Sequence, residues 1–211
     1  MSIKNEMTEL KEQVLKMCSF VVKNINDSIN YYLGKQQDVQ INDDIVDQYE
    51  RLIEEMCINI LLKERLFAKD LKEVTGALKL VSDLERIGDH AEDIYEFSKR
   101  IKKYQEQRID EISGLSDFVI EMINKSIKSY VNNDYDMAKE VIKDDDFVDK
   151  KYEEIIESLG KEEKYDKDYL PFAIYTTLVV KYLERIADHS VNIAEWVVYI
   201  SSGFYKDKMI F

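Results

Sequence analysis

Apolar residues recur at steps of three and four along most of the chain, which is the spacing of one face of an α-helix. In residues 7–33 these positions are Leu10, Val14, Met17, Val21, Ile25, Ile29 and Tyr32. Gly34 is a suitable stop for this helix. The same pattern predicts a second helix that begins between residues 37 and 42 and runs to about Ile60, and a third from about Leu71 past Ile94. Three amphipathic helices with short connections predict an antiparallel bundle.

The second half of the chain repeats this plan. A fourth helix is predicted over about 115–130, and a fifth over about 137–159, ending near Gly160. A charged loop then leads to a sixth helix, which continues to about Ser201. Pro171 is compatible with this helix because proline is tolerated in a first turn.

Two segments about 100 residues apart carry nearly the same sequence, L-E-R-I-small-D-H, at 84–90 and 183–189. Residues 25–29 resemble 123–127, and residues 43–47 resemble 145–149, in the same order. The sequence therefore predicts an internal duplication. The predicted fold is all-α, with two tandem three-helix bundles over residues 1–105 and 106–211 and a boundary in the polar segment 104–110.

Composition narrows the possible partners. Acidic residues number 43 and basic residues 30, for a formal net charge of −13. This balance argues against a nucleic-acid partner and favours cations or basic protein surfaces. Cys18 and Cys57 lie on apolar stripes and are predicted core residues. The chain shows neither a signal-peptide pattern nor an apolar run of about 18 residues, so we expect a cytoplasmic protein with no membrane insertion.

Acidic side chains form ridges beside the apolar faces of four predicted helices. In the third helix the ridge contains Glu85, Asp89 and Asp93, and in the sixth helix Glu184, Asp188 and Asn192 take the same places. The openings of the second and fifth helices add acids that include Asp43, Asp47, Glu50, Asp145 and Asp149. If two ridges meet, each carboxylate pair within ~5 Å costs roughly 3 kcal/mol at an effective dielectric of about 20. Two interpretations of the acidic ridges therefore remain open: a metal cluster, or a helix face that is exposed to solvent and carries salt bridges.

Oxygen ligands would favour hard cations such as Mg²⁺, Mn²⁺ or Ca²⁺, with Fe and Zn also compatible. His90 and His189 occupy equivalent places, and the simpler interpretation is two surface histidines rather than metal ligands. The Glu-x-x-His spacing of a carboxylate-bridged di-iron site is missing. Phosphate-binding glycine loops and nucleophile elbows are missing as well, so we predict that the protein is not an enzyme.

The duplicated acidic motifs and the Asp-rich helix openings resemble the PhoU family of phosphate-uptake regulators over nearly the whole chain. The resemblance implies two three-helix bundles related by an internal pseudo-twofold. It also implies multinuclear metal binding, with Fe, Zn, Mn or Mg, in some members. By position, the implied ligands are Asp43, Asp47, Glu85, Asp89, Asp93, Asp145, Asp149, Glu184, Asp188 and Asn192. Asp93 is a more acidic variant, since the equivalent family position is usually Asn.

The resemblance further implies a regulatory adaptor that links the ATPase of a phosphate ABC transporter to a phosphate sensor histidine kinase. Two alternatives remain: a metal-dependent phosphohydrolase that uses the carboxylate clusters, and a metal-free helical scaffold. The sequence leaves open the metal, direct phosphate binding, the transporter served and the oligomeric state, a homo-oligomer included.

Overall fold

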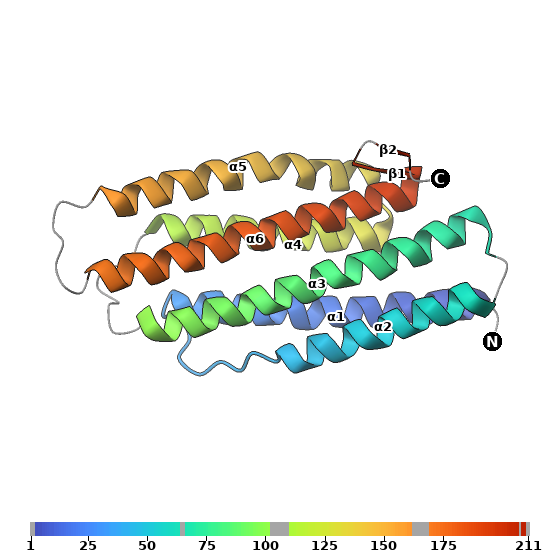
Figure 1. The fold of residues 1–211 in the computed structure, drawn as a ribbon, viewed down its shortest axis with the longest axis horizontal. Helices are drawn as coiled ribbons and strands as arrows, with labels where there is room; N and C mark the ends of the chain where they lie inside the picture. The colour runs from blue at the N-terminus through green and yellow to red at the C-terminus, as the bar shows by residue number, and fades with distance from the viewer. Residues whose placement is uncertain (1–2, 64–65, 102–109, 162–168, 207, 210–211) are drawn as a thin grey trace.

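Long antiparallel helices run back and forth along one axis of the molecule in the computed structural model (Figure 1). The structure describes residues 3–63, 66–101, 110–161, 169–206 and 208–209. The helices of this part are α1 (Ile3–Tyr32), α2 (Asp43–Lys63), α3 (Ala68–Ile101), α4 (Asp110–Asn132), α5 (Tyr135–Gly160) and α6 (Tyr169–Ser202). The all-α prediction of six long helices in two three-helix units is confirmed.

The predicted apolar stripes form the core. The α1 stripe from Leu10 to Tyr32 is buried along its whole length. The inner face of α3 is buried in the same way, and Cys18 and Cys57 lie within the core, as predicted. Burial of these stripes supplies the main favourable free energy of folding.

Local signals explain where several helices begin and end. Gly34, two residues after the end of α1, has a φ of +68°, a left-handed conformation that glycine adopts without strain. The side chain of Asp134 accepts a hydrogen bond from the Met137 backbone amide and caps α5. The predicted stop of α5 near Gly160 is also confirmed.

The two halves of the chain contact each other mainly through α3 and α6, which lie side by side (Figure 1). Gly76 of α3 permits a close approach, since a Cβ atom there would lie 2.5 Å from Cγ1 of Ile200 in α6. The predicted boundary between residues 105 and 106 lies outside the described residues and stays a prediction. None of the described helices is both long and apolar enough to cross a bilayer.

A short antiparallel hairpin follows α6, with strands β1 (Phe204–Tyr205) and β2 (Lys208–Met209). The hydrophobic pattern did not predict it. The hairpin packs on α6 through the rings of Tyr205 and Trp196, whose centroids are 3.9 Å apart.

Candidate metal centre

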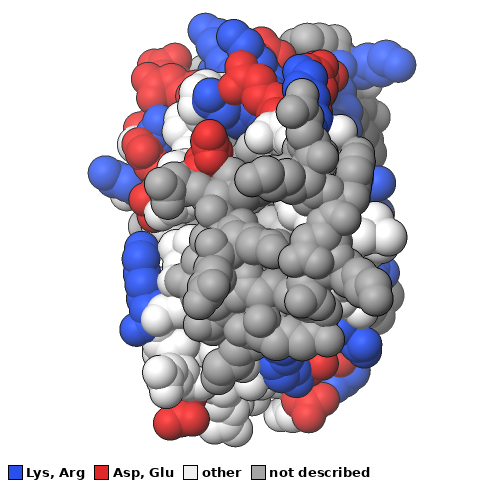
Figure 2. All heavy atoms as spheres, turned by 90° about the vertical axis from the view of Figure 1, so that its left-hand side faces the viewer, with Lys and Arg blue, Asp and Glu red and all other residues white. Residues whose placement is uncertain are grey.

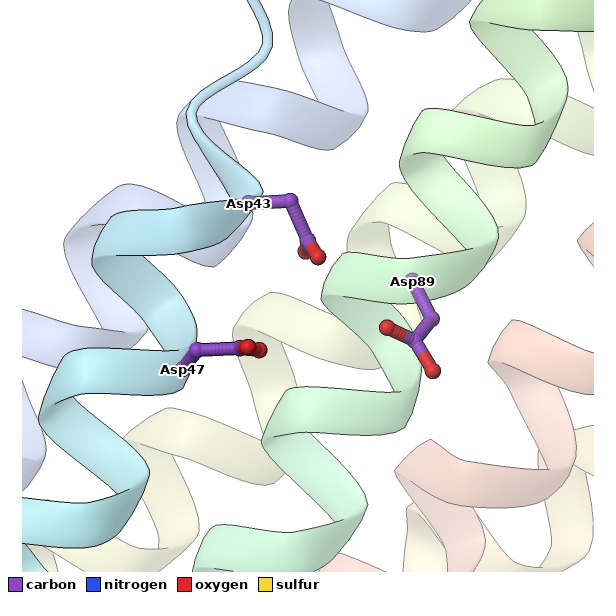
Figure 3. A group of neighbouring side chains, drawn as sticks. All are labelled: Asp43, Asp47 and Asp89. Carbon is purple, nitrogen blue, oxygen red and sulfur yellow. The ribbon is translucent and has the colours of Figure 1, made fainter.

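The first carboxylate cluster lies between α2 and α3. Asp43 is the first residue of α2, and Asp47 follows one turn later, so both side chains lie on the face of α2 that meets α3. Asp89 projects from α3 toward the same space (Figure 3). One oxygen from each of these three carboxylates lies within 4.8 Å of the other two. Two predicted acidic ridges therefore meet in the first half of the molecule.

Burial and mutual repulsion disfavour negative charge in this cluster. Burial, followed by the nearby charges of Asp89, Glu92 and Asp47, raises the pKa of Asp43 from 3.8 to about 6. Burial, followed by Asp89 and Glu50, raises the pKa of Glu85 to about 7. Such shifts mean that the charged forms lack full compensation from the protein.

Two arginines supply part of the counter-charge. Arg86 lies 3.0 Å from Asp89 and 3.4 Å from Glu85, and Arg51 lies 3.7 Å from Asp47. Both guanidinium groups belong to largely exposed side chains, so water screens these contacts. Arg86 therefore supplies counter-charge to Asp89 and Glu85, but within the described residues no ion pair reaches Asp43.

The donor set fits a metal ion. Oδ1 of Asp43 is buried and has no hydrogen-bond partner among the described residues, which is a costly state for a carboxylate oxygen. A cation between α2 and α3 would satisfy this atom and reduce the repulsion among the three carboxylates. Oxygen-only ligands of this kind suit hard divalent cations.

The second cluster lies between α5 and α6 and contains Asp145, Asp149, Glu184 and Asp188. Burial, followed by the charges of Asp149, Asp188 and Glu184, raises the pKa of Asp145 to about 6. Burial and Glu184 also raise the pKa of Asp188. Among the described residues, however, only Asp43, Asp47 and Asp89 bring three candidate ligand atoms within 4.8 Å of one another.

The two remaining predicted ligands contact the interface between α3 and α6. Asp93 lies 3.8 Å from Nδ1 of His90, and after burial its charge raises the pKa of Tyr182 in α6. Asn192 donates a hydrogen bond of 3.0 Å to Oδ1 of Asp83. The structure thus groups the other eight predicted ligands into two clusters and gives Asp93 and Asn192 contacts elsewhere.

The two histidines meet between the repeats rather than standing apart on the helix surface. Their ring centroids are 5.5 Å apart, and Nδ1 of His189 lies 2.9 Å from Oδ1 of Asp83. Burial, followed by His189, lowers the pKa of His90. The sequence interpretation missed this pairing because the motif shows equivalent positions without showing that they face each other.

Glu50 and Glu92 add to the first cluster although the candidate ligand set omitted them. The pKa of each is raised by burial first and by neighbouring acids second. Their positions, three residues after Asp47 and Asp89, place them on the same helix faces. This three-residue spacing could have identified both glutamates as members of the cluster from the sequence.

The fold and these clusters define a duplicated helical protein with one carboxylate cluster in each repeat. The family model named PhoU domain matches residues 14–98 and 112–197. The chain belongs to the PhoU family, as the resemblance of its motifs implied.

Curated relatives match over nearly the full chain. A protein of Clostridium acetobutylicum is 34% identical over 96% of this chain and 95% of its own length. One of Aquifex aeolicus is 36% identical over 96% and 94%, respectively. Both carry the name phosphate-specific transport system accessory protein PhoU homolog. The crystal structure of PhoU from Pseudomonas aeruginosa has a TM-score of 0.90 at 29% identity and covers 96% of this chain and 100% of that one.

Proposed function

We propose that this protein is an accessory and regulatory protein of a phosphate transport system. In this role it binds the ATPase of a phosphate ABC transporter and a phosphate sensor histidine kinase, on the cytoplasmic side, and represses the phosphate-starvation response when phosphate is plentiful. The observation that carries the proposal is similarity over nearly the full length to relatives named as accessory proteins of phosphate-specific transport. The net charge of −13 favours basic or mixed partner surfaces.

We further propose that the carboxylate clusters bind metal ions, with Fe, Zn, Mn or Mg as candidates. Asp43, Asp47, Glu85 and Asp89 would hold metal in the first repeat, and Asp145, Asp149, Glu184 and Asp188 in the second. The buried, unpartnered Oδ1 of Asp43 supports this assignment. A multivalent cation would join two helices of one repeat and fix the shape and charge of the surface that a partner meets.

A metal-dependent phosphohydrolase is the second candidate, because three close carboxylates suit a site in which metal activates water. That function needs a concave pocket over the carboxylates. The described cavities of about 250 and 590 Å³ lie elsewhere, with Lys11 and Glu73 in both linings and Phe67 in the larger one. The purely structural scaffold differs from both in predicting no effect of the clusters on partner binding.

The test uses a host that lacks its own copy of the gene and carries a reporter for the phosphate-starvation response. In phosphate-rich medium the deletion should switch the reporter on, and the wild-type protein should switch it off. The triple variant Asp43→Asn, Asp47→Asn, Asp89→Asn should fail to repress and should bind the purified ATPase or kinase more weakly. A reporter that stays off in the deletion strain would contradict the regulatory role.

The matched control removes acids from a charge-balanced surface. Glu154 and Glu157 on α5 pair with nearby lysines, at 2.6 Å to Lys151 and 2.9 Å to Lys161. Acidic and basic side chains are also interleaved at the upper part of the molecular end shown in Figure 2. The variant Glu154→Gln, Glu157→Gln should repress like the wild type. Hydrolysis of a phosphoester by the wild type, lost in Asp89→Ala, would instead favour the phosphohydrolase.

A further inference from the structure

The two repeats differ at a pair of positions beside their carboxylate clusters. When the repeats are aligned on the acidic motifs, Ser82 of α3 corresponds to Lys181 of α6, and Glu50 of α2 corresponds to Tyr152 of α5. Both differences lie where the two helices of a repeat face each other. They therefore change the charge of the second cluster.

In the first repeat this pair contributes another carboxylate to the cluster. Burial, followed by the charge of Glu54, raises the pKa of Glu50, whereas the nearby Ser82 side chain favours its charged form. Glu50 also acts on Glu85, since its charge is among the causes that raise the pKa of Glu85. Serine carries no charge, so this position neutralises none of the acids in the first cluster.

In the second repeat the same place holds a cation. Nζ of Lys181 lies 2.6 Å from Oε2 of Glu184, the counterpart of Glu85. The ammonium also lies 5.1 Å from the ring centroid of Tyr152, within the range of a cation–π contact. Lys181 is thus held between α5 and α6 by Glu184 and the aromatic ring, and its charge also favours the ionised form of Asp188.

A third difference removes another acid, because the position in α6 that corresponds to Glu92 is Val191. The second cluster therefore has fewer carboxylates than the first, and it includes the positively charged side chain of Lys181. It also lacks, within the described residues, the close triplet of ligand oxygens that the first cluster has.

We propose that the two carboxylate clusters are not equivalent: the first binds a divalent cation, and in the second the ammonium of Lys181 takes the place of that cation. The inference rests on the proposed metal binding and specifies which repeat it concerns. A metal ion in the second cluster would have to displace Lys181 from Glu184 or lie close to its positive charge. Lys181 is thereby assigned as the residue that determines metal occupancy in the second repeat.

The experiment is a calorimetric titration of metal-free protein with Mn²⁺, with bound Mn²⁺ also counted by electron paramagnetic resonance. The wild type should show one tight class of sites, which Asp43→Asn, Asp89→Asn abolishes. Lys181→Ser should add a second class by raising the affinity of the second cluster on the order of 10- to 100-fold. The reciprocal Ser82→Lys should weaken the first cluster by a similar factor.

Lys151→Ser is the matched control, since Lys151 also pairs with a glutamate at 2.6 Å and lies over an aromatic ring, but away from the cluster. It should leave Mn²⁺ binding unchanged. Circular dichroism checks folding, and Lys181→Gln replaces Lys181→Ser if the serine variant does not fold. Equal occupancy of both clusters in the wild type, unchanged in the folded Lys181 variant, would overturn the inference alone. No Mn²⁺ binding by any folded protein would overturn it together with the proposed metal function.

Discussion

Gly88 of α3 lies directly against the Asp43 carboxylate of α2. A Cβ atom at Gly88 would be 3.1 Å from Oδ1 of Asp43 and 3.1 Å from Cγ1 of Val46. Glycine here lets the N-terminal end of α2 approach α3 closely enough for Asp43 and Asp89 to share one space. The second repeat has Ala187 at this position, with a methyl group between the corresponding helices.

Gly88→Ala should therefore weaken metal binding more than it changes stability. Alanine favours a helix by up to about 1 kcal/mol relative to glycine, which offsets part of the cost of the close contacts. The displaced Asp43 carboxylate would lose its position in the cluster. We expect a lower Mn²⁺ affinity by calorimetry and a free energy of unfolding within about 1 kcal/mol of the wild type. Unchanged Mn²⁺ affinity in a folded Gly88→Ala protein would show that metal binding by Asp43 does not depend on the close contact between α2 and α3 at Gly88.

The raised pKa values predict how the stability of the metal-free protein depends on pH. Asp43 and Glu85 titrate near pH 6 and 7 in the folded protein, above their unfolded values of 3.8 and 4.5. The folded state therefore binds more protons than the unfolded state between about pH 4 and 7, so these two groups lower the stability as pH rises through that window. Saturating metal should reverse the loss at pH 8.

Thermal melts at several pH values with chelator present test this. In Asp43→Asn, Glu85→Gln the decline between pH 5 and 8 should be shallower than in the wild type. The difference between the pH curves of the two proteins removes the contribution of His90, whose lowered pKa makes the stability rise with pH instead. Asp117→Asn, which removes an exposed acid, is the control. Parallel pH curves for the wild type and the double variant would contradict the prediction.

The helices and the acidic ridges were predictable because both follow the helical period. A stripe such as that of α1 needs only sequence spacing, and the meeting of Asp43 and Asp89 needed one further assumption, that α2 and α3 are neighbours. The contacts between repeats were not predictable in this way. Asp93 and Asn192 fall at the edge of the ridge, and whether they face the cluster or the other repeat depends on how α3 crosses α6. The hairpin after Gly203 has strands of two residues, too short for a period to be visible.

Asp83 connects the two repeats and should contribute to stability. Its Oδ1 atom accepts hydrogen bonds from Nδ1 of His189 and from the side-chain amide of Asn192, at 2.9 and 3.0 Å. Asp83→Ala would leave both donors without this acceptor in a largely buried interface, at a cost of about 1–3 kcal/mol. Asp83→Asn keeps an acceptor oxygen and should lose less. Urea denaturation measures the difference, and an Asp83→Ala midpoint equal to that of Asp117→Ala would show that the contact contributes nothing.

The stacking of Tyr205 on Trp196 gives a direct probe of the C-terminal hairpin. The rings are 3.9 Å apart with an angle of 18° between their planes, and the Lys206 backbone amide donates a hydrogen bond to Glu195 at 3.3 Å. Tyr205→Ala should cost about 0.5–1.5 kcal/mol from the ring pair. It should also shift the fluorescence emission to longer wavelength, because the indole of Trp196 gains contact with water. Trp196 is the only tryptophan, so the signal reports this site alone.

Tyr135→Ala, at the exposed start of α5, should leave the emission unchanged. An unshifted spectrum in Tyr205→Ala would mean that the hairpin does not cover Trp196 in solution.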